Sequence, residues 1–245
     1  MHQERTYRNH LYHDRLTPFR CVVKETDLHI RATRNLAHEA KESILFHRGQ
    51  IESFIQQYPD FAVSLVPLRI PEPVPVIIAG MMDAARESGV GPMAAIAGAI
   101  AEHVGQALMT LSQEIIIENG GDVFIRTKKP LTVGIFANHS PLNMRMGLKI
   151  DSSDGPMAVC TSSGTVGHSL SLGRADAVTV VSRSCPLADA AATAIANQVK
   201  QKEDVQTAIQ FGKNIKGVKG LVIIIDDNVG LWGELKVVQL QQNKG

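Results

Sequence analysis

Two segments of this chain repeat one pattern: a proline, a long apolar residue and then a run of small residues. The first copy runs from Gly91 to Ala99 and reads GPMAAIAGA, and the second runs from Cys185 to Thr193 and reads CPLADAAAT. Proline suits the first turn of a helix and alanine suits its interior. The repeat therefore predicts two equivalent helices, one in each half of a duplicated chain.

The similarity of the halves extends beyond these helices. Each half continues with an apolar triple, Ile115-Ile116-Ile117 or Ile223-Ile224-Ile225, followed by an acidic or Asn-containing turn and another strand. Antiparallel hairpins combined with helices indicate an α+β fold made of two similar lobes. The alternative is that short Ala-rich helices and Ile runs look alike by chance. We expect residues 1–245 to form a single domain, with the lobes meeting near 126–155 and residues 1–15 forming a flexible arm.

Composition excludes several classes of protein. Lys plus Arg number 25 and Asp plus Glu 24, so no charge excess points to nucleic acid or to a membrane surface. The sequence has no apolar run long enough for a transmembrane helix and no apolar signal at its start. Its three cysteines, Cys21, Cys160 and Cys185, fit neither a disulfide framework nor a zinc pattern. We expect reduced thiols and a cytoplasmic location.

Apolar periodicity and turn residues predict the remaining elements. A long helix, capped by Thr33 or Asn35, should run to about Tyr58. Further helices are expected at 76–87, 93–111, 186–201 and 205–211. Strands are expected within 19–30 and at 61–68, 115–117, 123–125, 132–136, 148–150, 157–160, 177–182, 220–225 and 235–240.

The two copies of the repeated helix differ at the positions that carry oxygen. Ala95 and Ala99 of the first copy correspond to Asp189 and Thr193 of the second. Residues four apart on a helix share a face, and a carboxylate with a hydroxyl suits Mg²⁺ or Ca²⁺. The sequence thus suggests a metal site at Asp189 and Thr193. Equally, Asp189 lies in the first turn of its helix and can simply interact with the helix dipole.

Two polar loops are candidates for ligand binding. Asn119, Gly120, Gly121 and Asp122 form a turn whose glycines allow a ligand to approach the backbone; we expect Gly121 to need a positive φ. A tight hairpin without a ligand explains the same residues. The second loop, formed by Thr161, Ser162, Ser163 and Gly164, offers hydroxyls and amides for a phosphate. His139 and His168 lie in loops near these residues, and either is a candidate base.

Taken in order, these segments resemble the ApbE-like superfamily, whose characterised members are FAD:protein FMN transferases. The family shows a small-residue helix, an Asn-x-Gly-Gly-Asp-type turn, a Thr-Ser-Gly loop and an Ala-Asp-x-x-x-Thr helix. The counterparts here are residues 95–101, Asn119–Asp122, Thr161–Gly164 and Ala188-Asp189 with Thr193. The chain looks most like an uncharacterised cytoplasmic branch of the superfamily. The resemblance implies an ApbE-like fold, FAD bound between the lobes, a divalent metal on Asp189 and Thr193, and His168 as a catalytic residue.

This chain departs from the transferases at two places. Their Lys-Gly-Tyr is replaced by Gly98-Ala99-Ile100, and their His-Ile-Ile-Asp-Pro segment has only a loose counterpart around His168. These differences argue against transfer of FMN to a target protein.

Three functions are consistent with the sequence. The first is a metal-dependent transferase or pyrophosphatase acting on FAD or a related phosphorylated ligand. The second is a flavin- or ligand-binding protein without catalysis, and the third is a structural protein in which Asp189 is only a helix-terminal charge. A homodimer through the Ala/Gly-rich helices or the helix that begins at Asn35 also fits.

Overall fold

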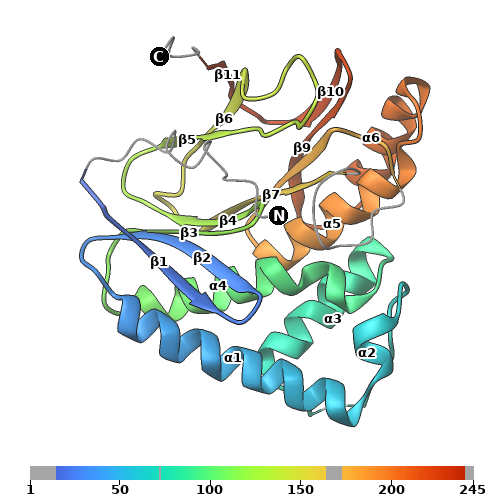
Figure 1. The fold of residues 1–245 in the computed structure, drawn as a ribbon. Helices are drawn as coiled ribbons and strands as arrows, with labels where there is room; N and C mark the ends of the chain where they lie inside the picture. The colour runs from blue at the N-terminus through green and yellow to red at the C-terminus, as the bar shows by residue number, and fades with distance from the viewer. Residues whose placement is uncertain (1–14, 72, 164–172, 241–245) are drawn as a thin grey trace.

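An eight-stranded antiparallel sheet forms the middle layer of the molecule (Figure 1). The computed structural model describes residues 15–71, 73–163 and 173–240. The strand order is β1-β2-β3-β4-β7-β8-β9-β10, and every neighbouring pair is antiparallel. The strands are β1 (Thr17–Val23), β2 (Thr26–Ala32), β3 (Ile115–Asn119), β4 (Asp122–Arg126), β7 (Met157–Ser162), β8 (Ala177–Ser182), β9 (Val218–Ile225) and β10 (Asn228–Gly233).

The order of elements repeats along the chain, as the two similar lobes required. Each half contributes to the main sheet two strands, then supplies helices, then contributes two more strands, and the halves meet where β4 pairs with β7. The helices are α1 (Ala37–Gln57), α2 (Asp60–Val63), α3 (Val76–Ser88), α4 (Ile96–Leu108), α5 (Cys185–Gln198) and α6 (Val205–Lys213), with short 3₁₀ turns η2 (Pro92–Ala95) and η3 (Lys202–Asp204). The predicted α+β class with antiparallel strands is confirmed.

The helices and a smaller sheet cover opposite faces of the main sheet (Figure 1). The smaller sheet has the order β11-β6-β5, formed by β5 (Leu131–Gly134), β6 (Met146–Ile150) and β11 (Val237–Gln239). Ile115 and Ile117 belong to the core beneath the helices, whereas Ile116 belongs to the core beneath the small sheet. Successive side chains of a strand point to opposite faces, so strands covered on both sides must be apolar throughout. The Ile triples reflect this double burial.

Two predictions for the connecting segments were wrong. Residues 61–68 were expected to form a strand, but the chain makes the short helix α2 and then an irregular segment. Phe61 is fully buried through its packing with Phe54, whose ring centroid lies 5.0 Å away, so its apolar character reflects a tertiary contact. Secondly, residues 226–228 do not lead directly to a last strand at 235–240. They turn into β10, which pairs with β9 and was missed because its alternating pattern is short and Gly-interrupted.

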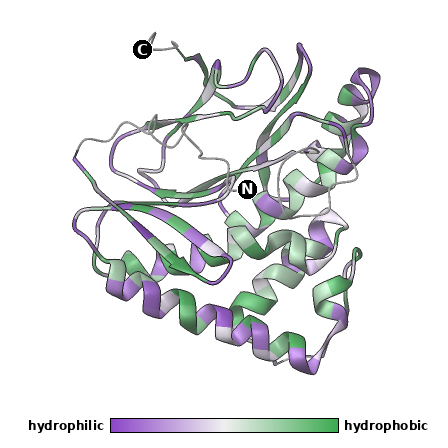
Figure 2. Ribbon diagram, viewed as in Figure 1, coloured by the Kyte–Doolittle hydropathy of each residue, from purple (hydrophilic) through white to green (hydrophobic). Residues whose placement is uncertain are grey.

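The long helix α1 packs across α4 and carries alternating hydrophilic and hydrophobic bands (Figure 2). The N-cap residue of α1 is Leu36, which makes no side-chain capping bond, so the prediction of Thr33 or Asn35 as the cap was wrong; Asn35, one residue earlier, accepts a hydrogen bond from the backbone N–H of Ala37 at 2.9 Å. Within the described residues, no helix is both long and apolar enough to cross a membrane.

A histidine pair lies between α1 and α4. The ring centroids of His47 and His103 are 4.9 Å apart. Burial, with a smaller contribution from the charge of His47, lowers the pKa of His103 to about 4. Burial also lowers the pKa of His47, against the effect of a hydrogen bond with Gln50. Both rings are therefore neutral at pH 7.

Acid should destabilise the protein through this pair. Unfolded chains bind protons on His near pH 6.5 but the folded His103 does so only near pH 4, so stability falls as the pH drops through that interval. We expect the melting temperature of His103→Gln to fall less between pH 7.5 and pH 5 than that of the wild type. His38→Gln, an exposed control on α1, should retain the wild-type dependence. An equal loss in all three proteins would contradict this role of His103.

Candidate functional site

The N-terminal halves of α4 and α5 contact each other at Gly98. A Cβ atom added at Gly98 would lie 2.4 Å from the carbonyl oxygen of Cys185 and 2.9 Å from the Cβ of Asp189. These distances are shorter than a side chain tolerates, so glycine is required for the helices to approach so closely. The lysine that the resemblance implies for the matching position would have no room here.

At this contact each helix supplies one carboxylate that accepts hydrogen bonds at the start of the other helix. Asp189 on α5 accepts a hydrogen bond from the backbone N–H of Gly98 at 2.9 Å and a second from the N–H of Ala97, both in the first turn of α4. Glu102 on α4 accepts a hydrogen bond from the backbone N–H of Cys185, the first residue of α5, at 2.6 Å. Each side chain thus satisfies N–H groups that a helix start leaves without partners. Asp189 does interact with a helix terminus, but with that of the other helix.

Negative charge accumulates around these helix starts. Burial, and secondly the charge of Asp122, raise the pKa of Asp189 well above its usual value, although the N–H groups of Gly98 and Ala97 act in the opposite direction. Burial likewise raises the pKa of Glu102, against the effect of the Cys185 N–H. A positive ion in this corner would relieve the repulsion between the two aspartates.

The Asn119–Asp122 turn lies at the same corner. The side-chain amide of Asn119 donates to the carbonyl oxygen of Ala97 at 3.0 Å, which ties the hairpin to α4. Asp122 is buried on β4, opposite Cys160 of β7.

The two glycines of the turn have different roles. Gly120 adopts the positive φ, at 70°, so the expectation that Gly121 needs it was wrong. A Cβ at Gly121 would instead lie 2.5 Å from the carbonyl oxygen of Thr161, so Gly121 permits close approach to β7. Sequence alone does not distinguish a glycine kept for its φ from one kept for space.

The predicted phosphate loop begins beside this turn. The N–H of Thr161 donates to the carbonyl oxygen of Gly121 at 3.0 Å, and its hydroxyl lies 2.9 Å from that of Thr179. Ser162 ends β7, and Ser163 follows it; both are partly buried. Gly164 and His168 lie outside the described residues. Thr193 is buried one helical turn after Asp189 on α5.

Two thiols lie directly beneath the corner. The Sγ atoms of Cys160 and Cys185 are 3.6 Å apart, and neither residue is exposed. Burial raises the pKa of Cys160 well above its usual value. For Cys185 a hydrogen bond with Cys160 lowers the pKa, but burial and the neighbouring carboxylates outweigh it and raise the pKa to about 11.

Sequence reasoning missed Glu102, which anchors α5. Its signal was available, since Glu102 is the one acidic residue in α4. The importance of Gly98 as a contact between helices had no comparable signal.

The donors in this corner fit a hard divalent cation. The candidate donors are the carboxylates of Asp122 and Asp189, together with Thr193 one helical turn after Asp189; burial, and secondly the charge of Asp122, raise the pKa of Asp189. Within the described segments, no three His, Cys, Asp or Glu side chains group as a metal-binding cluster. Mg²⁺ often has only one or two carboxylate ligands and completes its shell with water and substrate phosphates, so this small set is compatible with it.

Solved structures share this architecture. The flavinyl transferase ApbE of Pseudomonas stutzeri in its apo form matches with a TM-score of 0.60 and 14% identity, covering 91% of this chain and 95% of that one. The ApbE protein of Thermotoga maritima matches with a TM-score of 0.56 and 14% identity, covering 89% and 97%. The chain therefore has the ApbE-like α+β fold.

The family follows from sequence. A family model described as "AbpE bacteria" matches residues 8–235, so the chain belongs to that family. It is 40% identical over 230 residues to the UPF0280 protein of Methanopyrus kandleri, covering 91% of this chain and 93% of the relative. It is 38% identical over 222 residues to the UPF0280 protein of Methanocaldococcus jannaschii, covering 88% and 90%.

The packing at Gly98 can be tested by adding one methyl group. Gly98→Ala should destabilise the protein by about 1–3 kcal/mol, as overpacking does. Gly80→Ala in α3 is the control, because a Cβ there meets no atom within 4 Å, and it should gain up to about 1 kcal/mol from helix propensity. Urea unfolding measures both changes. Equal stability of the two variants would show that α4 and α5 are not in close contact.

The thiols should be inert in the folded protein. With a pKa of about 11, Cys185 is ionised in only about one molecule in a thousand at pH 8, and alkylation requires the thiolate. We expect iodoacetamide to leave Cys160 and Cys185 unmodified in native protein and to modify all three cysteines in guanidinium, as read by peptide mass spectrometry. An adduct on either residue in native protein would contradict the buried arrangement.

Proposed function

We propose that this protein is a metal-dependent enzyme acting on a flavin nucleotide, FAD, or on a related phosphorylated ligand. Its family and ApbE-like fold support the ligand class. The observation that carries the proposal is that two acids belong to one corner: the buried Asp122, which pairs with the end of β7, and Asp189, whose pKa is raised first by burial and secondly by the charge of Asp122. A phosphorylated ligand and its cation would complement that corner.

Asp189 and Thr193 would hold Mg²⁺ or Ca²⁺, with Asp122 contributing charge. The cation, when bound, neutralises the diphosphate of the ligand. The hydroxyl of Ser162 and the backbone amides of Ser163 and Gly164 would bind phosphate oxygens. These residues continue the loop that begins at Thr161. The turn from Asn119 to Asp122 would contact the nucleoside.

His168 remains our proposed base for activating an attacking group, on the sequence alone. The reaction class we favour is transfer or hydrolysis at the diphosphate, without FMN transfer to a protein. The three free cysteines fit a cytoplasmic location.

The second candidate is a flavin- or ligand-binding protein without catalysis. Gly98 favours it, because the contact between α4 and α5 leaves no room there for a side chain that could reach a ligand. Binding is common to both candidates, so turnover must separate them.

Calorimetric titration of metal-stripped protein with FAD, with and without Mg²⁺, is the decisive experiment. We expect stoichiometric binding that depends on Mg²⁺ and weakens at least tenfold, or by about 1.4 kcal/mol, in Asp189→Asn. Asp151→Asn, at an exposed loop, is the control and should bind as the wild type does. No FAD binding in either condition would exclude FAD and move the search to other phosphorylated ligands, whereas an unchanged Mg²⁺ affinity in Asp189→Asn would contradict the metal site. Chromatography of the mixture for FMN and AMP then decides between enzyme and binding protein.

The melting temperature of Asp189→Asn tests the site in the absence of a flavin ligand. The raised pKa of Asp189 means that its ionisation costs stability, and this cost accumulates as the pH rises from the pKa of the unfolded chain to that of the folded protein. Metal-stripped Asp189→Asn should therefore melt no lower than the wild type at pH 7, because the amide oxygen can still accept the Gly98 N–H. Mg²⁺ should raise the melting temperature of the wild type only.

A further inference from the structure

Exposed apolar side chains are frequent on α1, around α2 and at the start of α3, at one edge of the helix layer (Figure 1). Among the described residues, eleven large hydrophobic side chains are exposed, and six of them lie between positions 45 and 76: Leu45, Phe46, Val63, Leu65, Val66 and Val76. Phe46 on α1 is 62% exposed and Val76 at the start of α3 is 76% exposed. Single exposed apolar residues are ordinary, but a concentration of them marks an interaction surface.

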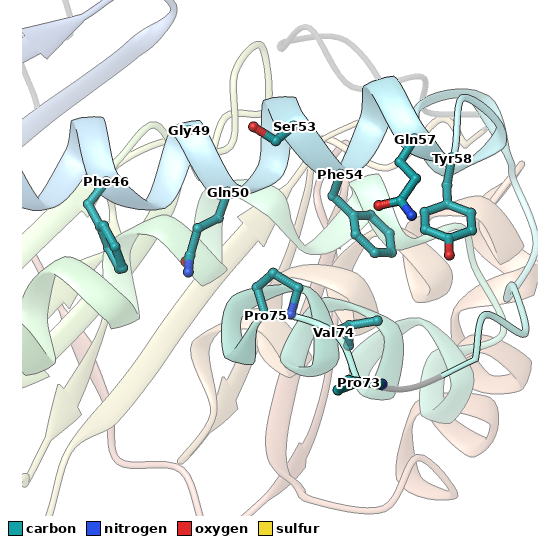
Figure 3. A pocket seen from close by; sticks show the side chains of 10 residues that line it. All are labelled: Phe46, Gly49, Gln50, Ser53, Phe54, Gln57, Tyr58, Pro73, Val74 and Pro75. Atoms are coloured by element: carbon teal, nitrogen blue, oxygen red, sulfur yellow. The ribbon is translucent and has the colours of Figure 1, made fainter.

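A groove of about 510 Å³ runs along α1 at this edge (Figure 3). One wall is a stripe of α1 from Phe46 to Tyr58, and the other is the extended segment Pro73-Val74-Pro75. The lining is aromatic, aliphatic or neutral polar, and none of its ten residues carries a charge: Phe46, Gly49, Gln50, Ser53, Phe54, Gln57, Tyr58, Pro73, Val74 and Pro75. An occupant should therefore be uncharged and largely apolar where it touches the groove.

Gly49 is a costly residue for its position in the monomer. It lies in the middle of α1, where glycine is unfavourable relative to alanine, and a Cβ there would meet no atom within 4 Å. Among the described residues, no contact requires its small size. A glycine beside an exposed phenylalanine provides a hole next to a knob on one helix face.

We infer that the occupant is a second copy of this chain, with α1 packed antiparallel to the partner's α1. A two-fold axis at the helix, between positions 46 and 49, places the Phe46 ring of one protomer against Gly49 of the other, and does so twice. The surface is thus self-complementary. The 21 residues of α1 span about 32 Å, which is comparable with the width of a standard interface of about 800 Å² per protomer.

The charges along α1 are compatible with this arrangement. The exposed charged residues Lys41 and Glu42 lie toward its N-terminal end, whereas the exposed Ser53, Gln56 and Gln57 near its C-terminal end are neutral. Antiparallel pairing about positions 46 and 49 brings the charged end of each helix to the neutral end of the other. No like charges face each other.

Two charged residues in the second half of α1, Arg48 and Glu52, pair with the β1–β2 hairpin. Arg48 donates to Thr26 and Glu25 at the β1–β2 hairpin, and Lys24 of that hairpin pairs with Glu52 at 2.7 Å. The inferred interface is therefore free of them. It is also independent of the proposed function, since Asp189 and Asp122 lie on α5 and β4.

Sedimentation velocity across a concentration series tests the dimer. We expect a dimer for the wild type, and monomers for Phe46→Lys and for Gly49→Glu, because each places an unpaired charge in an apolar contact. Leu231→Glu, at an exposed apolar position on β10, is the control and should remain dimeric. Circular dichroism verifies that each variant is folded.

The double variant tests the register. Because position 46 faces position 49 of the partner, Phe46→Lys combined with Gly49→Glu should restore the dimer through two intersubunit ion pairs, in a salt-sensitive manner. A monomeric wild type at every concentration would overturn the inference, including when the groove binds some other molecule. A dimer that survives both single substitutions would overturn it too, by placing the interface elsewhere.

Discussion

The exchange of carboxylates between α4 and α5 is the interaction on which the site depends. Asp189 of α5 accepts hydrogen bonds from N–H groups at the start of α4, and Glu102 of α4 accepts one from the N–H of Cys185 at the start of α5. The exchange is feasible only because Gly98 lets the two helices touch. Since α4 covers β3 and β4 while α5 covers β7 and β8, this contact also fixes the two halves of the duplicated fold relative to each other.

Duplication explains why distant segments form one corner. The halves join through the pairing of β4 with β7, which places the Asn119–Asp122 turn of the first half next to Thr161 of the second. The equivalent helices then meet above this junction. One copy has kept small residues and the other carries an acid, so the symmetric framework holds an asymmetric set of donors.

Much of the fold was predictable because its signals are local and strong. The two Pro-initiated helices, the Ile triples and the Gly-Gly hairpin each combine periodicity with a residue that fixes the backbone. Elsewhere the prediction was wrong because tertiary contacts decide the structure. The apolar residues after Pro59 form the short helix α2, in which Phe61 packs against Phe54. For the site, the sequence identified Asp189 but assigned it to the dipole of its own helix or to a metal. Its bonds to Ala97 and Gly98 depend on helix packing, which no local pattern encodes.

The paired thiols have a consequence for biogenesis. Cys160 and Cys185 are separated by 25 residues, and both are buried only when α5 lies against β7 and α4. During synthesis Cys160 leaves the ribosome before α5, the helix that covers it, has been made. After its synthesis α5 must still pack against β7. The protein is therefore most vulnerable to oxidants while it is being made, and a mature molecule can tolerate conditions that would damage a nascent one.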